Sequence, residues 1–424
     1  SAGAHSLSTG AINLEGGTLD LANGNLLLGN RSNTMGILSI NAGTALVGRL
    51  RLPADSADLN CTGTLQMAGG VLYLGGLESA TKTTAARSNL WLSGGTIRAL
   101  TNFNSTLNME LLNSPGPGVV TFDIWTNTVQ LSGVVSGPGK LIKTGDGTLT
   151  LHQANLFGGA TISSGVMIVE YGAGSGSGTG YLAVATGGTL AGTGRVSALN
   201  LGGGILAPGG DLDYVGTLTA GIMNWTNGVY RWNVQNFSGG IWDRVLGTGA
   251  LTIASGIVTV KVVSTSGAGM SGVADNYDVS AGYTTTIASA SSIVGFDANK
   301  FVVDISDFAN DEGATWSIST LGTNLVLVVT PPVSSSRLVY WDSNATIGSL
   351  QPTNGVWGET SNTWMVGGVA PNVIWDNSRN DKALFTAGAN ATPTVRVDIA
   401  SATNSGIYMP TLNNTHSFVI NGTG

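Results

Sequence analysis

The sequence predicts an all-β fold, namely a parallel β-solenoid whose short strands coil around one continuous core. Three observations predict it. A short phrase built around paired glycines recurs along the chain, apolar residues alternate beside it, and no segment sustains the 3.6-residue period of an amphipathic helix. Strands and tight turns that repeat without helices are typical of coils that stack by parallel pairing.

The composition narrows the classes of protein that fit. Glycine contributes 64 residues without a three-residue period, and proline only 11, which excludes collagen. Hydrophobic residues make up 42% of the chain, enough to form a core, which excludes a disordered glycine-rich chain. Charged residues make up only 10%, so Ser, Thr and Asn must cover much of the surface. This balance favours an elongated β structure over compact helical domains.

The recurring phrase is a short apolar strand, two glycines and a further strand. Alternation such as Val258 and Val260 places every second side chain on one face, and the glycines permit a tight corner. Repetition of this phrase predicts coils of about 20–25 residues. Asn-Gly pairs, as at Asn23-Gly24, leave an antiparallel sandwich as the alternative. The clearest copies of the phrase are residues 13–19, 66–72, 91–97, 185–190 and 201–206.

Residues 137–169 carry the most specific pattern. They read GPGKLIKTGDGTLTL, followed by Asn155, Phe157 and a Gly165-led strand. This pattern resembles the autotransporter-associated β-strand repeat, also called the passenger-associated transport repeat, from which it departs at His152 and Phe157. Residues 206–219 are similar to a segment near the end of such passengers. The resemblance implies a right-handed parallel β-helix displayed at the surface of a bacterial cell.

The Pro331-Pro332 pair and the serines after it indicate a boundary between two modules. We therefore expect a solenoid over residues 1–333. Residues 334–424 are expected to begin a second, Trp-rich β-module, with strands at residues 383–385 and 395–398. The chain would then be one period of a longer tandem array, or a subunit that stacks end to end.

One segment after the boundary is a candidate calcium site. Asp376, Ser378, Asn380 and Asp381 offer alternating oxygen ligands, which calcium prefers. The central glycine and distal glutamate of an EF-hand loop are absent from this segment. Calcium is therefore the one cofactor that the sequence offers ligands for, and no other cofactor is expected.

Four tryptophans near the same boundary are candidate binding or interface residues. If these side chains are exposed, they would stack on the faces of sugar rings. If they are buried, they would form the core of a joining element. We favour the second interpretation, because such side chains dominate cores and interfaces. They are Trp341, Trp357, Trp364 and Trp375.

The sequence predicts no catalytic residues. The three histidines are far apart, and no Gly-x-Ser-x-Gly motif is present. The densest acidic group is Asp304, Asp307, Asp311 and Glu312, and no Arg or Lys clusters beside it in sequence. A polysaccharide-active enzyme, the less favoured alternative, would need a compact cleft of Asp, Arg and Lys.

These observations predict an extracellular, cell-surface structural protein that assembles into a filament, surface layer or stalk. A net charge of −7 offers no basic surface for nucleic acid, and no run of 18 apolar residues would form a transmembrane helix. The expected partners are further copies of the chain, end to end or side by side, or tandem modules of it. The alternative function is that of an adhesin that binds surface glycans.

Overall fold

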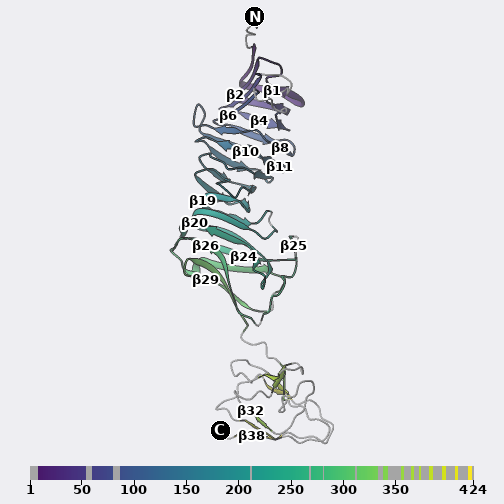
Figure 1. Ribbon diagram of the computed structural model, residues 1–424, viewed down its shortest axis with the longest axis vertical. Coiled ribbons are helices and arrows are strands. Elements are labelled where there is room, and N and C mark those ends of the chain that lie inside the picture. The colour runs from purple at the N-terminus through teal and green to yellow at the C-terminus, as the bar shows by residue number, and fades with distance from the viewer. Residues whose placement is uncertain are drawn as a thin grey trace. The chain divides into compact units, whose positions relative to one another are not determined.

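The structure, a computed structural model, describes residues 8–53, 60–79, 86–210, 213–266, 269–279, 281–310 and 313–332, and beyond these only short strands between residues 338 and 422. The chain divides into two compact units (Figure 1). The first comprises residues 1–278, 283–311 and 316–329, and the second comprises residues 330–424 with two short segments, 279–282 and 312–315.

The first unit is a parallel β-solenoid, which confirms the predicted fold class. Its rungs stack one on another from β1 (Ser8–Leu27) onward, and each rung turns through up to three columns of strands (Figure 1). The long strand β2 (Thr34–Arg51) shows the arrangement, because it pairs in turn with β3, β4 and β5 of the next rung. One coil thus contributes to all three columns.

Each column is a ladder of short parallel strands. The first contains β3 (Thr62–Met67), β6 (Arg87–Leu92), β9 (Met109–Leu111) and β12 (Val135–Ser136). The second contains β4 (Val71–Leu74), β7 (Thr96–Ala99), β10 (Val119–Asp123), β13 (Lys140–Thr144), β15 (Ala160–Ile162) and β17 (Tyr181–Ala185). The third contains β5 (Leu77–Glu78), β8 (Phe103–Ser105), β11 (Thr128–Leu131), β14 (Thr148–Leu151), β16 (Gly165–Val169) and β18 (Gly188–Gly192).

Longer rungs continue the stack. The strands β19 (Arg195–Pro208) and β20 (Thr217–Asn236) lead to β22 (Arg244–Gly247), β23 (Leu251–Ile253) and β24 (Val258–Ser266), and then to β26 (Tyr283–Ser289), β27 (Ile293–Val294) and β28 (Phe301–Asp307), all in parallel pairs. Thr189 pairs with Ile205, 16 residues on, whereas Val258 pairs with Phe301, 43 residues on. The expected coil length of 20–25 residues is therefore too narrow, because the observed coils are both shorter and longer.

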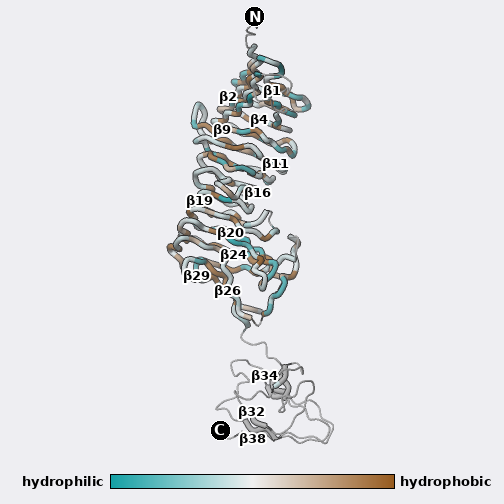
Figure 2. Tube along the Cα trace, in the orientation of Figure 1, coloured by the Kyte–Doolittle hydropathy of each residue, from teal (hydrophilic) through white to brown (hydrophobic). Residues whose placement is uncertain are grey.

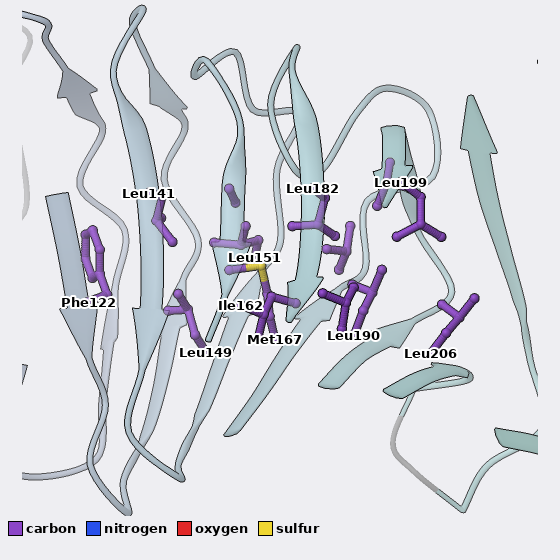
Figure 3. Close-up of a cluster of buried hydrophobic side chains, with 14 of the residues drawn as sticks. Phe122, Leu141, Leu149, Leu151, Ile162, Met167, Leu182, Leu190, Leu199 and Leu206 are labelled. Atoms are coloured by element: carbon purple, nitrogen blue, oxygen red, sulfur yellow. The ribbon is translucent and has the colours of Figure 1, made fainter. Parts of the chain in front are cut away.

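The core consists of identical positions stacked from rung to rung. In the third column Val129, Leu149, Met167, Leu190 and Leu206 pair successively in register, and all are fully buried. Figure 3 shows the last four of them. Hydrophobic and hydrophilic positions alternate along the rungs, as a half-buried strand requires (Figure 2). The core is thus continuous along the unit rather than divided between rungs.

Glycines occupy the corners as predicted. Between the first and second columns, Gly43, Gly70 and Gly95 have φ angles of 82°, 67° and 83°. These φ angles lie in the left-handed region that favours glycine. The paired glycines at residues 69–70 and 94–95 therefore mark the same corner in successive rungs, whereas those at residues 187–188 lie at the turn from β17 to β18, between the second and third columns.

Antiparallel strands end the parallel stack beyond β28. The strand β30 (Asn324–Thr330) pairs antiparallel with β26 and also pairs with β29 (Thr315–Leu321). Two short strands also pair antiparallel with the long ones: β21 (Ile241–Trp242) pairs with β20, and β25 (Met270–Ser271) pairs with β24. A 3-10 helix, η1 (Ala298–Lys300), precedes β28. Five aromatic side chains pack together in this region, namely Phe237, Tyr277, Tyr283, Phe308 and Trp316.

The second unit contains two small sheets, which confirms a second β region. One has the order β34 (Asn372–Val373), β33 (Trp364–Val366), β31 (Leu338–Trp341), β35 (Lys382–Leu384) and β37 (Gly406–Tyr408). The other has the order β32 (Gly355–Trp357), β36 (Thr394–Val397) and β38 (Val419–Gly422), all parallel. Across the described part of the chain, no helix is long and apolar enough to span a membrane.

Candidate functional site

The predicted calcium ligands cannot be placed. Asp376, Ser378, Asn380 and Asp381 all lie outside the described residues. Within the residues that the structure does describe, no group of three or more His, Cys, Asp or Glu side chains could hold a metal ion. The calcium site therefore stays a prediction.

The four tryptophans of the second unit are placed in part. Trp341 and Trp364 pair across the antiparallel strands β31 and β33, and the Trp364 side chain is fully buried. Trp357 lies on β32, and Trp375 lies outside the described residues. For Trp364, burial favours a core role over a platform for sugars.

The structure brings together charged residues that are distant in sequence. On the third column, Arg231 pairs with Lys261, and Lys261 pairs with Asp304, on three successive strands. The Lys261 Nζ atom lies 2.9 Å from Asp307 Oδ2 and 3.7 Å from Asp304 Oδ2, and Arg231 forms an ion pair with Asp213. We call these five residues the charged ladder. Asp311 and Glu312 lie outside the described residues.

The charged ladder has the residue types that a polysaccharide-active enzyme would need, but its pKa shifts have the wrong direction for proton transfer. Hydrogen bonding from Ser306 holds the pKa of Asp304 below its usual value. Hydrogen bonding to Asp307 raises the pKa of Lys261. A general base or acid works best with a pKa near the operating pH. These shifts instead keep both groups charged, which suits ion pairs between rungs.

A buried lysine lies inside the solenoid at a corner of the second column. Lys143 is fully buried and occupies the core stack between Phe122 and Ile162. Its Nζ atom donates hydrogen bonds to the carbonyl oxygens of Thr144, Gly145 and Ser164, at 3.1, 2.6 and 3.0 Å. Those donations satisfy the corner carbonyls of two rungs, so Lys143 joins the rungs from within.

Burial determines the charge state of this lysine. Desolvation lowers the pKa of Lys143 to about 8, although the nearby carboxylates of Asp123 and Asp146 oppose the shift. Three donated hydrogen bonds match the three N–H groups of an ammonium. The group therefore serves as a fixed donor to the backbone.

Asn155 has a similar role where the first column lacks strands. It is buried, its Oδ1 atom accepts a hydrogen bond from the Val135 N–H at 2.7 Å, and its Nδ2 atom donates to Gly176 O at 2.7 Å. Its own N–H donates to Ser175 O at 2.8 Å. A single side chain thus connects the preceding rung to the following one. Lys143 and Asn155 both belong to the pattern at residues 137–169, and each of them forms hydrogen bonds that hold neighbouring rungs together.

Asp243 is a third buried polar group between rungs. Its carboxylate accepts hydrogen bonds from the backbone N–H groups of Gly216 and Asn233, at 2.8 and 2.9 Å, and its carbonyl accepts from Trp232 Nε1 at 2.8 Å. Burial raises the pKa of Asp243 well above its usual value. These contacts fix the start of β22 against β20.

His152 and Cys61, the remaining titratable candidates in the described part of the chain, do not share a site. His152 lies 2.8 Å from Glu170 on the neighbouring rung, and Cys61 is buried. His5 and His416 lie outside the described residues. The polar groups that the structure assembles therefore act mainly between rungs.

Sequence reasoning missed the charged ladder and the interior roles of Lys143 and Asn155. The spacing of Leu141 and Lys143 was the available signal for the lysine, because strand alternation places both on the inner face. For the charged ladder no signal was available, since its members come from coils of unequal length.

Comparison with known proteins adds no relative. No protein-family model matches the chain, and no curated protein is significantly similar to it.

Proposed function

We propose that this chain is a structural protein of the bacterial cell exterior, which assembles with further copies of itself into a filament, surface layer or stalk. One observation carries the proposal: parallel pairing continues from β1 to β28 around an unbroken apolar core. Backbone hydrogen bonds along such a ladder resist bending, so a stiff, extended body is the property that this fold supplies.

Polar contacts between neighbouring rungs support the same role. Arg98 on β7 forms an ion pair with Asp123 on β10 at 2.6 Å, and Lys143 and Asn155 connect rungs from inside. The charged ladder adds ion pairs at the surface. Each exposed pair contributes little alone, about 0–1 kcal/mol. Their common direction, from rung to rung, favours stiffness along the stack over catalysis.

The extracellular location is proposed from the resemblance to the passenger-associated repeat. That family displays its β-helices outside the cell, and the matching residues Lys143 and Asn155 both hold adjacent rungs together in this chain. We propose no catalytic role for the chain, since the ion pairs of Lys261 with Asp304 and Asp307 join neighbouring rungs.

Self-association end to end is proposed at β1. This strand pairs with β2, and no other strand of the described residues pairs with it. Ile12 pairs with the buried Leu38 and is 37% exposed. Among the described residues, the first rung therefore presents apolar side chains and backbone groups that pair with no further strand, and a rung of a second copy would cover them.

Electron microscopy of the purified chain tests the proposal. We expect ordered filaments or sheets at high protein concentration. The variant Ile12→Lys should shorten or abolish end-to-end assemblies, because an edge lysine opposes strand pairing. Leu156→Lys is the matched control, since Leu156 is 60% exposed on a loop away from β1 and should leave assembly unchanged. Monodisperse single rods at every concentration would contradict the scaffold role.

A further inference from the structure

A row of outward side chains crosses the first column. Ser39, Gln66 and Trp91 pair in register on β2, β3 and β6. Leu90 and Leu92 are buried, so strand alternation directs Trp91 away from the core, and it is 38% exposed. The row therefore places a large aromatic ring beside an amide and a hydroxyl on the surface of the solenoid.

This row forms the floor of a groove of about 170 Å³. Its lining residues on the strands are Ser39, Asn41, Gln66, Met67 and Trp91. Ala68 and Ser93 directly follow β3 and β6, and Leu112 and Pro115 border the groove. Hydrogen bonds hold the bordering loop against β6: the Gly116 N–H donates to Ser93 Oγ at 3.0 Å, and the Gly118 N–H donates to Ser93 O at 2.8 Å. The groove is thus built by the fold itself.

The polar groups of the groove suit a neutral ligand. In the part of the chain that the structure describes, no Lys, Arg, Asp or Glu lines it. Among the described residues, the Gln66 carboxamide has no hydrogen-bonding partner, so its donor and acceptor are both available. The Asn41 Nδ2 atom donates to Glu15 Oε1 at 2.8 Å, which orients that amide and leaves its oxygen as an acceptor.

We propose that this groove binds one ring of a neutral glycan. The apolar face of a pyranose ring would lie on Trp91, and its hydroxyl groups would bond to Gln66 and Asn41. An aromatic ring supplies apolar contact, whereas the amides supply orientation. The volume is below the roughly 300 Å³ of typical small-molecule pockets, so a single ring is the fitting unit and the rest of the glycan lies along the surface.

This binding activity goes beyond the scaffold role and is independent of it. The groove lies on β2, β3 and β6, whereas the proposed end-to-end contact uses the free edge of β1. Loss of glycan binding with assembly intact, or the reverse, would therefore identify which of the two proposals fails.

Binding of the full chain to neutral hexasaccharides tests the site. Saturation-transfer NMR with cellohexaose, xylohexaose, mannohexaose and chitohexaose as probes should detect at least one ligand. Trp91→Ala should weaken that binding by about tenfold or more, as truncation of an aromatic anchor commonly does. Trp91→Phe should restore part of it, and Gln66→Ala should weaken it several-fold.

Trp125→Ala is the matched control. Trp125 is more exposed than Trp91, at 59%, and does not line the groove, so its removal should change affinity by less than about twofold. Failure of all four probes to bind would overturn the proposal. Equal loss in the Trp91→Ala and Trp125→Ala variants, or binding only of acidic polygalacturonate or of peptides, would also overturn it.

Discussion

A lysine in the middle of an apolar stack shows how single residues control this fold. Lys143 occupies a position that is Phe122 on one neighbouring strand and Ile162 on the other. Two of its three hydrogen bonds reach the carbonyls of Gly145 and Ser164, which a hydrophobic side chain would leave without donors, whereas Thr144 O also accepts from the Ile124 N–H at 3.0 Å. Buried polar groups are costly unless they are paired, and here the pairing is complete for an ammonium.

Lys143 makes the stability of the chain depend on pH. Its pKa is about 8 in the folded protein and 10.5 in an unperturbed lysine. Between these values the unfolded state binds more protons, so the free energy of unfolding should rise as the pH increases from about 8 to about 10.5. Below pH 8 both states are protonated, and this residue contributes no pH dependence. Denaturant titrations across this range would measure the effect.

The variant Lys143→Met isolates that contribution. It keeps the length of the side chain and removes the donor, so we expect a loss of about 1–3 kcal/mol at pH 7 from the carbonyls left unpaired. Its unfolding free energy should lack the rise between pH 8 and 10.5. If the unfolding free energies of the unmodified protein and of the Lys143→Met variant depended on pH in the same way, Lys143 would not be buried and hydrogen-bonded as described.

At the scale of the strand, the corner glycines determine how closely rungs approach. Gly165 begins β16 with a φ of 66°, and a Cβ atom there would lie 2.3 Å from Gly145 O and 2.6 Å from Lys143 Nζ. Backbone conformation and space both exclude a side chain at this position. The same corner is Gly145 on the preceding rung and Gly187 on the following one, both with positive φ.

We therefore expect Gly165→Ala to destabilise the solenoid by more than about 1 kcal/mol. Gly172→Ala is the control, because an added Cβ there meets nothing within 4 Å, and its effect should stay within about 0.5 kcal/mol. Thermal unfolding of both variants measures the difference. Equal melting temperatures would contradict the close approach of the two rungs at this corner.

The strands could be predicted from the sequence wherever residues within a single coil determine them. Paired glycines and alternating apolar residues determine corners and inner faces within one coil, and both recur as expected at Gly70 and Gly95. Contacts between rungs were not predictable, because coil length varies from 16 to 43 residues. Arg231, Lys261 and Asp304 meet only once those lengths are known. Trp91 belonged to a recurring phrase, yet its groove depends on the loop at Pro115.

At the scale of the whole first unit, one core and one set of ladders account for its order. The inner positions stack without interruption, and the antiparallel strand β30 ends the stack beside β26. Polar residues act where the apolar stack alone would leave backbone groups unpaired, as at Lys143, Asn155 and Asp243. The physical basis of the proposed scaffold is therefore regular parallel stacking.

Spin-label distances along the third column test that stacking most directly. Thr128, Thr148, Val166, Thr189, Ile205, Val229, Thr259 and Val302 pair successively in register. At about 4.8 Å per rung, labels at Thr128 and Val229 should lie about 24 Å apart, and labels at Thr128 and Val302 about 34 Å apart. Electron–electron double resonance distances that do not increase with the number of rungs would contradict the account.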